Sequence, residues 1–153
     1  MEIRNYRGVT LIELVVTMAI ISVLAVGIVP LSQVSYKRAK EIELKQNLRI
    51  IRQALDDYKM TSDKYRLAKQ GADSGYPKRL ELLVEGVDLG EAAGMKKKFL
   101  RRIPKDPMTE DGQWGLRSYF DDPDSDMWGG QDVYDVYTQS DKIALDGTPY
   151  REW

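Results

Sequence analysis

The stretch VTLIELVVTMAIISVLAVGIVPL, residues 9–31, carries a single charged residue, Glu13, in an otherwise largely apolar run. From Leu14 to Leu31 there is no charge at all. At about 1.5 Å per residue, a helix of this length reaches across the roughly 30 Å hydrocarbon core of a bilayer. Because a carboxylate beside such a core is costly unless it has a partner, Glu13 requires a specific explanation.

Three interpretations of the apolar run compete. A secretory signal peptide would place basic residues, here Arg4 and Arg7, before the run and a cut near Ala25. A transmembrane anchor fits the length equally well, whereas a buried core helix rarely stays free of charge for so long. Cations also follow the run, so the charge-asymmetry rule leaves its orientation open; they are Lys37, Arg38, Lys40 and Lys45.

The helical pattern continues beyond the apolar run. An apolar stripe recurs at steps of three and four residues and predicts one helix from about residue 10 to about residue 60; it comprises Leu44, Leu48, Ile51, Leu55 and Tyr58. Pro30 is expected to kink or locally open this helix, and residues 61–63 to end it. The residues that follow are too few to cover the whole helix, so its first half must be buried in lipid or in other subunits.

The rest of the chain predicts loops, one small helix and short strands, which gives an α+β fold. The second half of the long helix is expected to pack on a small antiparallel sheet. The tryptophans and tyrosines after residue 113 are expected in the core or in strand pairs and not in a cofactor site; they are Trp114, Tyr119, Trp128, Tyr134, Tyr137, Tyr150 and Trp153. The expected elements are a turn at 71–77, a helix at 77–85, an extended connector at 103–107, and strands at 115–120, 133–138 and 142–145, with 96–98 as a solvated basic face.

Composition excludes several classes of function. The 153-residue chain has no cysteine and no histidine, which rules out disulfides, thiol nucleophiles, histidine bases and zinc sites built from these side chains. The net charge is -1 and no basic stripe is interleaved with aromatic residues, so nucleic acid is not expected as the primary partner. No arrangement of the other polar side chains suggests catalysis, and we expect no enzyme.

Gly8 followed by VTLIELVVTMAIISVLA is similar to the class III signal of type IV pilin-like proteins. The shared marks are a short basic leader, a glycine at the cut, an apolar helix, and a glutamate at the fifth mature position when Val9 is the first. Pro30 stands where the family's helix carries its proline, whereas Val9 replaces the family's usual phenylalanine. Within this superfamily the chain most resembles the major pseudopilin (G type) of type II secretion, through residues 48–65, 76–83, 103–115 and 133–147.

This resemblance implies a processing and assembly pathway. A prepilin peptidase would cut between Gly8 and Val9 and methylate the new amine of Val9. The expected regions are a leader at 1–8, a transmembrane and assembly helix at 9–31, and a periplasmic pilin-like domain at 32–153. The product would span the bacterial inner membrane once, with its N-terminus cytoplasmic, and join a short periplasmic filament that drives export of folded proteins. The implied partners are further copies of the chain, minor pseudopilins, an assembly platform protein and a secretion ATPase.

Glu13 then has a rational partner in the amine that cleavage creates at Val9. Pairing between neighbouring subunits would fix the axial register of a filament. Pairing within one chain is also available, because the two residues are four apart on a helix. The simplest alternative is that Glu13 only complements the helix dipole at the first turn.

Calcium is the one cofactor that the composition allows, since it prefers oxygen ligands. Asp141 and Asp146 lie near the place where major pseudopilins hold calcium, and they are the first candidates. Asp122, Asp124 and Asp126 alternate as in a calcium loop, but the glycine and the glutamate of an EF-hand are missing. These aspartates could equally be turn formers.

Three rival functions stay open from the sequence alone. A type IV pilin subunit of a surface fibre, used for adhesion, motility or DNA uptake, would share the N-terminal signature. A monomeric binding domain would use the helix only as a membrane tether. A secreted enzyme would be cut near Ala25 and released.

Overall fold

The computed structural model describes residues 8–65, 74–89, 96–125 and 127–153. Its main element is one helix, α1 (Leu11–Tyr65), of 55 residues. The chain forms two compact units, Met1–Arg38 and Ala39–Trp153, and α1 contributes to both. The predicted long helix is therefore confirmed, and it ends slightly later than expected.

The start of α1 has a clear local cause. The backbone N–H of Glu13 donates to the Thr10 hydroxyl at 3.3 Å, and the Leu14 N–H donates to the Thr10 carbonyl at 3.1 Å. Thr10 thus acts as the N-cap, and the Thr-x-x-Glu spacing is that of a capping box. Pro30 lies inside α1, and the kink expected there stays a prediction.

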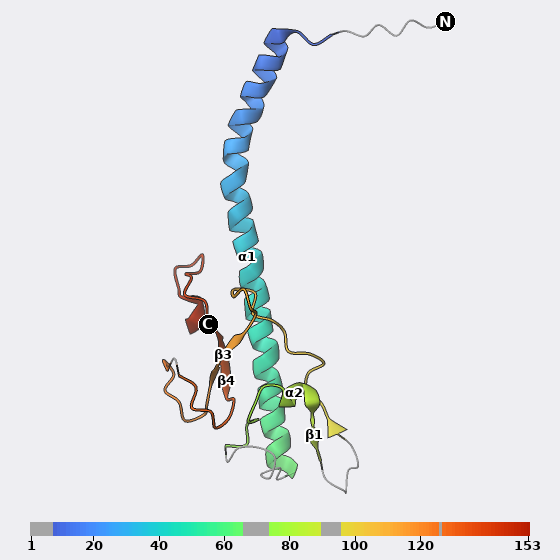
Figure 1. The fold of residues 1–153 in the computed structure, drawn as a ribbon, viewed down its shortest axis with the longest axis vertical. Helices are drawn as coiled ribbons and strands as arrows, with labels where there is room; N and C mark the ends of the chain where they lie inside the picture. The colour runs from blue at the N-terminus through green and yellow to red at the C-terminus, as the bar shows by residue number, and fades with distance from the viewer. Residues whose placement is uncertain (1–7, 66–73, 90–95, 126) are drawn as a thin grey trace, which may run out of the picture. The chain divides into compact units, whose positions relative to one another are not determined.

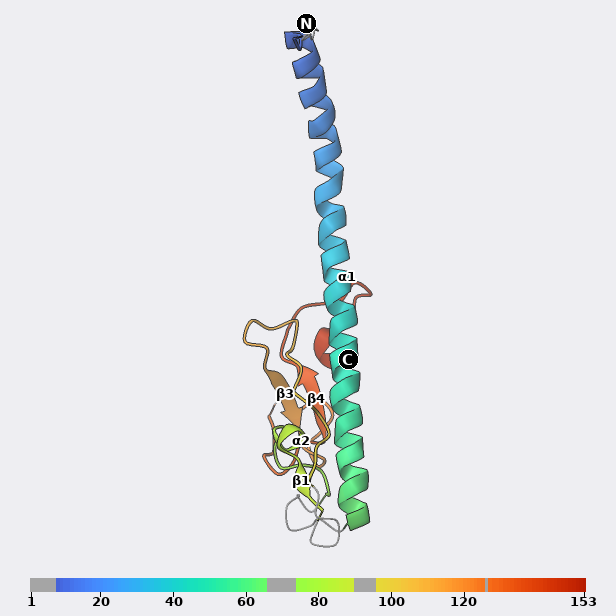
Figure 2. The same cartoon turned by 90° about the vertical axis from the view of Figure 1, so that its right-hand side faces the viewer.

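The core of the second unit is built on the apolar stripe of α1. All five stripe residues are buried, with exposed fractions of at most 3%, so the sequence-based stripe is confirmed. Facing them are Leu83, Val87, Val133, Val136 and Tyr150, contributed by segments that lie far apart in the sequence. Figure 1 shows the ribbon, and in Figure 2 the small elements lie together on one side of the C-terminal part of α1.

Two small antiparallel sheets complete the unit. Strand β3 (Trp114–Arg117) pairs with β4 (Asp135–Thr138), with Gly115 opposite Tyr137. Strand β1 (Val87–Asp88) pairs with β2 (Lys96–Lys97). The short helix α2 (Leu82–Glu85) precedes β1, and a 3-10 turn, η1 (Tyr150–Glu152), follows the last loop. This arrangement confirms the α+β prediction.

Several expected elements differ in extent. The helix predicted at 77–85 is helical only over α2, and residues 78–81 before it form bends and a turn. The strand predicted at 142–145 is reduced to one bridge between Ile143 and Pro149. The basic run at 96–98 was expected only as a solvated face, yet Lys96 and Lys97 form β2. Residues 71–73 of the predicted turn lie outside the described part of the chain.

The prediction for the aromatic residues is correct only in part. Trp114, Tyr137 and Tyr150 are buried, whereas Trp128 is 40% exposed, Tyr134 44% and Tyr119 53%. The exposed rings belong to the loop between β3 and β4 and its junction with β4.

Candidate functional site

The N-terminal unit presents an apolar surface on all sides of α1. The exposed fractions are 83% for Leu11, 62% for Met18, 75% for Val23 and 78% for Val26. This part of α1 is long and apolar enough to span a membrane, and none of that window is buried within the protein. Such a surface is stable only in lipid or against other protein subunits.

Glu13 and Val9 lie at the start of this apolar helix. Val9 is 70% exposed, and Glu13 is an exposed acidic residue in the first turn of α1. A carboxylate in the first turn complements the partial positive charge of the helix N-terminus. Glu13 thus stands where its proposed dipole-capping role requires it, and residues 1–7 of the leader lie outside the described part.

A second cluster joins α1 to the C-terminal loop. One carboxylate oxygen of Glu41, Oε1, accepts hydrogen bonds from the Leu145 backbone N–H and the Tyr150 hydroxyl, both at 2.8 Å. The Tyr150 ring is 1% exposed. Burial, followed by the hydrogen bond and the negative charge of Glu41, raises the pKa of Tyr150 well above its usual range. Glu41 therefore clamps the loop to the helix.

The two preferred calcium candidates already have partners within this loop. Asp146 accepts hydrogen bonds from the Thr148 hydroxyl at 2.7 Å and the Thr148 N–H at 3.0 Å, and these bonds lower the pKa of Asp146. Asp141 is exposed and lies 3.9 Å from a guanidinium nitrogen of Arg151. Among the described residues, no three acidic side chains gather around a point that could hold a metal ion. A cage of three carboxylates is thus not preformed among the described residues, and calcium binding stays a prediction from the sequence.

The acidic loop after β3 is organised by two other aspartates. Asp121 accepts from the backbone N–H groups of Ser118 at 2.7 Å and Gly129 at 3.0 Å. These bonds, that of Gly129 above all, lower the pKa of Asp121. Asp132 is buried and accepts from the Ser118 hydroxyl at 2.8 Å and the Tyr119 N–H at 2.9 Å, as well as from Ser74.

The alternating aspartates of this loop are described only in part. Asp122 and Asp124 are exposed, and the Asp122 carbonyl accepts from the Ser125 N–H at 2.9 Å. The third alternating residue, Asp126, lies outside the described part of the chain. Asp121 and Asp132, which were not calcium candidates, are thus the aspartates that accept the hydrogen bonds of this loop.

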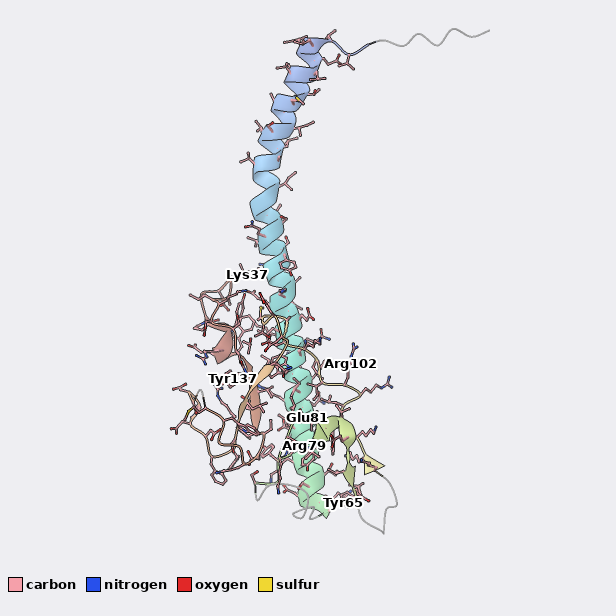
Figure 3. The ribbon with its side chains drawn as sticks, in the orientation of Figure 1. Lys37, Tyr65, Arg79, Glu81, Arg102 and Tyr137 are labelled. Atoms are coloured by element: carbon pink, nitrogen blue, oxygen red, sulfur yellow. The ribbon has the colours of Figure 1, made fainter. Side chains whose placement is uncertain are left out.

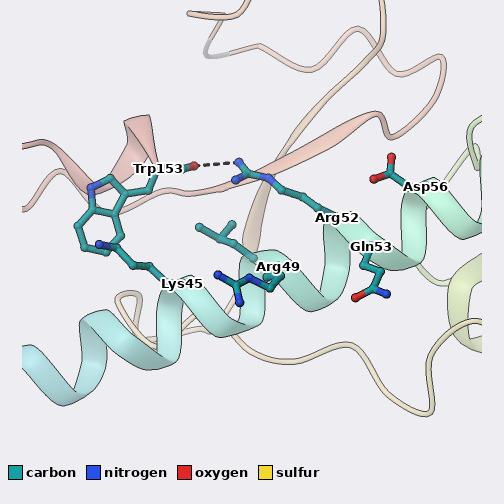
Figure 4. Close-up of a pocket in the computed structure, with 7 residues that line it drawn as sticks. Lys45, Arg49, Arg52, Gln53, Asp56 and Trp153 are labelled. Atoms are coloured by element: carbon teal, nitrogen blue, oxygen red, sulfur yellow. Dashed lines mark hydrogen bonds between the residues drawn. The ribbon is translucent and has the colours of Figure 1, made fainter.

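Arg52 joins Trp153 to α1 beside an open hollow of about 560 Å³. Its guanidinium pairs with the Asp135 carboxylate at 2.7 Å and donates to the Trp153 carbonyl at 2.8 Å. Figure 4 shows this second bond and the polar side chains that line the hollow. The lining is mainly cationic on the helix side, and Lys45 lies 4.0 Å from the centre of the Trp153 ring.

Sequence reasoning missed Glu41, Arg52 and Asp132 as structural centres. Their partners lie 104 and 109 residues away for Glu41 and 83 residues away for Arg52. No local pattern links residues at such separations. A weak signal existed only for Asp132, which stands two residues after the Gly129–Gly130 pair in a loop rich in aspartate.

Comparison with known proteins separates the rival functions. A family profile described as the prokaryotic N-terminal methylation motif matches residues 3–29. Type II secretion system core protein G of Escherichia coli (strain K12) is 33% identical over 107 residues, covering 69% of this chain and 68% of that protein. The chain belongs to the core protein G family of type II secretion systems.

Two further core protein G sequences agree with this assignment. The protein of Klebsiella pneumoniae is 30% identical over 112 residues, which is 72% of this chain and 74% of that protein. The protein of Vibrio cholerae is 28% identical over 114 residues, which is 74% of this chain and 73% of that protein. No solved structure gives a significant match. The chain is thus a major pseudopilin of type II secretion, as its N-terminal and C-terminal motifs predicted, and its apolar helix fits a membrane anchor.

Proposed function

We propose that this core protein G homologue is made as a precursor, cut by a prepilin peptidase between Gly8 and Val9, and methylated on the new amine of Val9. The mature chain waits in the inner membrane with residues 32–153 in the periplasm. It then joins a pseudopilus together with minor pseudopilins, through an assembly platform protein driven by a secretion ATPase. The methylation motif over residues 3–29 supports the cut, and the core protein G relatives support the assembly.

The observation that carries this proposal is the uncovered apolar surface of the N-terminal unit. A tether for a monomeric domain needs lipid contact on every side and has no use for a charged group at its start. In this chain Glu13 stands at the start of the apolar surface, one helical turn after the residue whose amine cleavage exposes. A carboxylate there acquires a cationic partner only after cleavage, which links processing to assembly.

We further propose that Glu13 of one subunit pairs with the Val9 amine of its neighbour in the filament. In the membrane-stored monomer, Thr10 and Glu13 stabilise the start of α1, as the 3.3 Å cap hydrogen bond indicates. In the filament, the Glu13 carboxylate interacts with the full positive charge of the neighbour's amine and no longer only with the partial charge of its own helix N-terminus. The surroundings are poor in water, and an interaction between charges is stronger there.

Cleavage and assembly are tested with separate substitutions in the full chain, co-expressed with the peptidase and assembly proteins. Gly8→Val should leave full-length precursor in the membrane, because a branched side chain hinders the extended backbone that proteolysis needs. Glu13→Gln should be cleaved normally and fail to enter filaments, whereas Glu13→Asp, which keeps the charge, should retain part of the incorporation. Mass determination of the mature N-terminus measures the first step, and sheared filament yield measures the second.

Two results would contradict the proposal. A mature N-terminus other than methylated Val9 would overturn the processing step. Wild-type filament yield from Glu13→Gln would show that the carboxylate does not set the register.

A further inference from the structure

A group of cations directly after the apolar run has no part in the processing and assembly proposed above. Tyr36, Lys37 and Arg38 are successive residues of α1 within the first unit, and we call them the boundary cluster. Tyr36 is 65% exposed, Arg38 is exposed and Lys37 is half-buried. Successive side chains on a helix point about 100° apart, so the three fan around α1. Figure 3 labels the side chain of Lys37 on the helix.

The charges that come first after the apolar run are all positive. No acidic residue occurs over residues 14–40, and Lys40 adds a third cation to the two of the boundary cluster. The first acids that follow are Glu41 and Glu43, which belong to the second unit. Glu41 is engaged by the two hydrogen bonds that hold the C-terminal loop. Positive charge therefore prevails where the helix leaves the apolar run.

The boundary cluster lies at the depth of the lipid headgroups when the apolar run spans the membrane. Tyr36 lies five residues after Leu31, the last residue of the run, and Arg38 seven. The helix is unbroken between them, and the Ser35 hydroxyl donates to the Leu31 carbonyl at 3.0 Å. At about 1.5 Å per residue, the cluster covers roughly 8–11 Å beyond the run. The headgroup layer is about 5–8 Å thick on each side of the hydrocarbon core, and long cationic side chains reach back to it.

Orientation in the membrane does not explain these cations. Lysine and arginine are enriched in the cytoplasmic flanks of membrane helices. In the proposed topology Lys37 and Arg38 lie on the periplasmic side, and the cut after Gly8 removes Arg4 and Arg7 from the cytoplasmic side. The mature chain thus keeps its flanking cations on the side that the charge rule disfavours. Their position points to a ligand at that surface.

We propose that the boundary cluster binds the phosphates of anionic phospholipids at the periplasmic surface of the membrane and so fixes the depth of the stored subunit. This inference rests on the proposed function for the insertion and orientation of the apolar helix. The Arg38 guanidinium suits phosphate because it donates in a planar fork, and Lys37 adds a second charge. The ring of Tyr36 suits the interface, where its apolar face meets acyl chains and its hydroxyl meets water. A subunit that leaves the membrane for the filament must release these lipids.

Quenching by lipids in contact with the helix tests this proposal in the full chain reconstituted in vesicles. The natural chain has no cysteine, so Gln33→Cys takes a single fluorophore one helical turn before Lys37. The vesicles contain phosphatidylcholine and phosphatidylglycerol, with a quenching spin label on the acyl chain of one lipid or of the other. We expect phosphatidylglycerol to bind beside the fluorophore more strongly than phosphatidylcholine. High salt should reduce this preference, because it screens the charges.

Substitution of the two cations should remove most of the preference. Lys37→Gln combined with Arg38→Gln should lower it at least about fivefold, which is the contribution of one cation near an anionic surface. Lys37→Arg keeps the charge and should keep the preference. Lys78→Gln combined with Arg101→Gln removes two exposed cations of the second unit and is the matched control, for which we expect the full preference.

The outcomes separate the inference from the proposed function. An equal preference for phosphatidylglycerol in the unaltered chain and in the Lys37 and Arg38 double variant would overturn the lipid site and leave the filament role intact. That result together with a lost filament yield would assign the two cations to acidic side chains of a neighbouring subunit instead. If the unaltered chain does not insert into vesicles, or its mature N-terminus is not Val9, the proposed function fails and the lipid site fails with it.

Discussion

Glu41 offers the sharpest test of how the C-terminal loop is held. Its carboxylate accepts two hydrogen bonds, one from the buried Tyr150 hydroxyl and one from the Leu145 N–H, each 2.8 Å long. A hydrogen bond to a charged group contributes about 1.5–3 kcal/mol, and less where water competes, as it does at the partly exposed Leu145. Glu41→Ala should therefore lower the free energy of unfolding of the second unit by about 2–4 kcal/mol.

Glu41→Gln separates charge from hydrogen bonding at the same position. The amide oxygen still accepts from both donors, so we expect a loss of only about 0.5–1 kcal/mol. Glu43→Ala removes an exposed carboxylate two residues away and serves as the control, with an expected change within about 0.5 kcal/mol.

The assay is unfolding of the full chain in detergent, by denaturant and by heat, with tryptophan fluorescence as the signal. Trp153 reports on this loop, because its ring N–H donates to the Thr148 hydroxyl at 2.8 Å. A unit of this size should lose roughly 4 °C in melting temperature per kcal/mol, so Glu41→Ala should melt about 8–16 °C lower. If Glu41→Ala is as stable as Glu43→Ala, the clamp contributes nothing and the reasoning is refuted.

Three further predictions follow from local geometry. Gly115→Ala should destabilise the second unit by about 1–3 kcal/mol in the same assay, because its methyl group would overlap the Tyr137 ring; an unchanged midpoint would contradict the tight β3–β4 packing. The pKa of Asp121 is lower in the folded than in the unfolded chain, so its carboxylate stabilises the fold above the unfolded pKa of about 4, and this stabilisation is lost on further acidification. In Asp121→Asn the melting temperature should therefore fall less steeply with pH below about 4. A fall as steep as in the unaltered chain would contradict this. The calcium site expected from the sequence predicts a higher melting temperature with calcium than with chelator, and Asp141→Ala should abolish this difference; equal melting temperatures of the unaltered chain under the two conditions would reject the site.

Local sequence order decided the first half of this protein. The unbroken apolar run, the Thr10 cap, the position of Glu13 and the stripe from Leu44 to Tyr58 each depend on neighbours within a few residues, which is the range that helical periodicity covers. The same local pattern carried the likeness to pseudopilins, because the signal for processing is read as a short linear segment.

Tertiary structure decided the second half. Strands of two to four residues are too short to show a clear alternation in the sequence, and the helix expected over 77–85 forms only over Leu82–Glu85. The sequence also did not single out Asp121 and Asp132, whose carboxylates accept hydrogen bonds from residues of the loop between β3 and β4.

The sequence by itself determined that the chain has an apolar assembly helix with a processing signal and an amphipathic continuation. Only the folded structure decided which carboxylates clamp loops and which aromatic rings reach the surface. The physical reason is the distance along the sequence between the residues that interact. Helix formation is governed by contacts three and four residues apart, whereas the bonds of Glu41 and Arg52 join residues 83 to 109 apart.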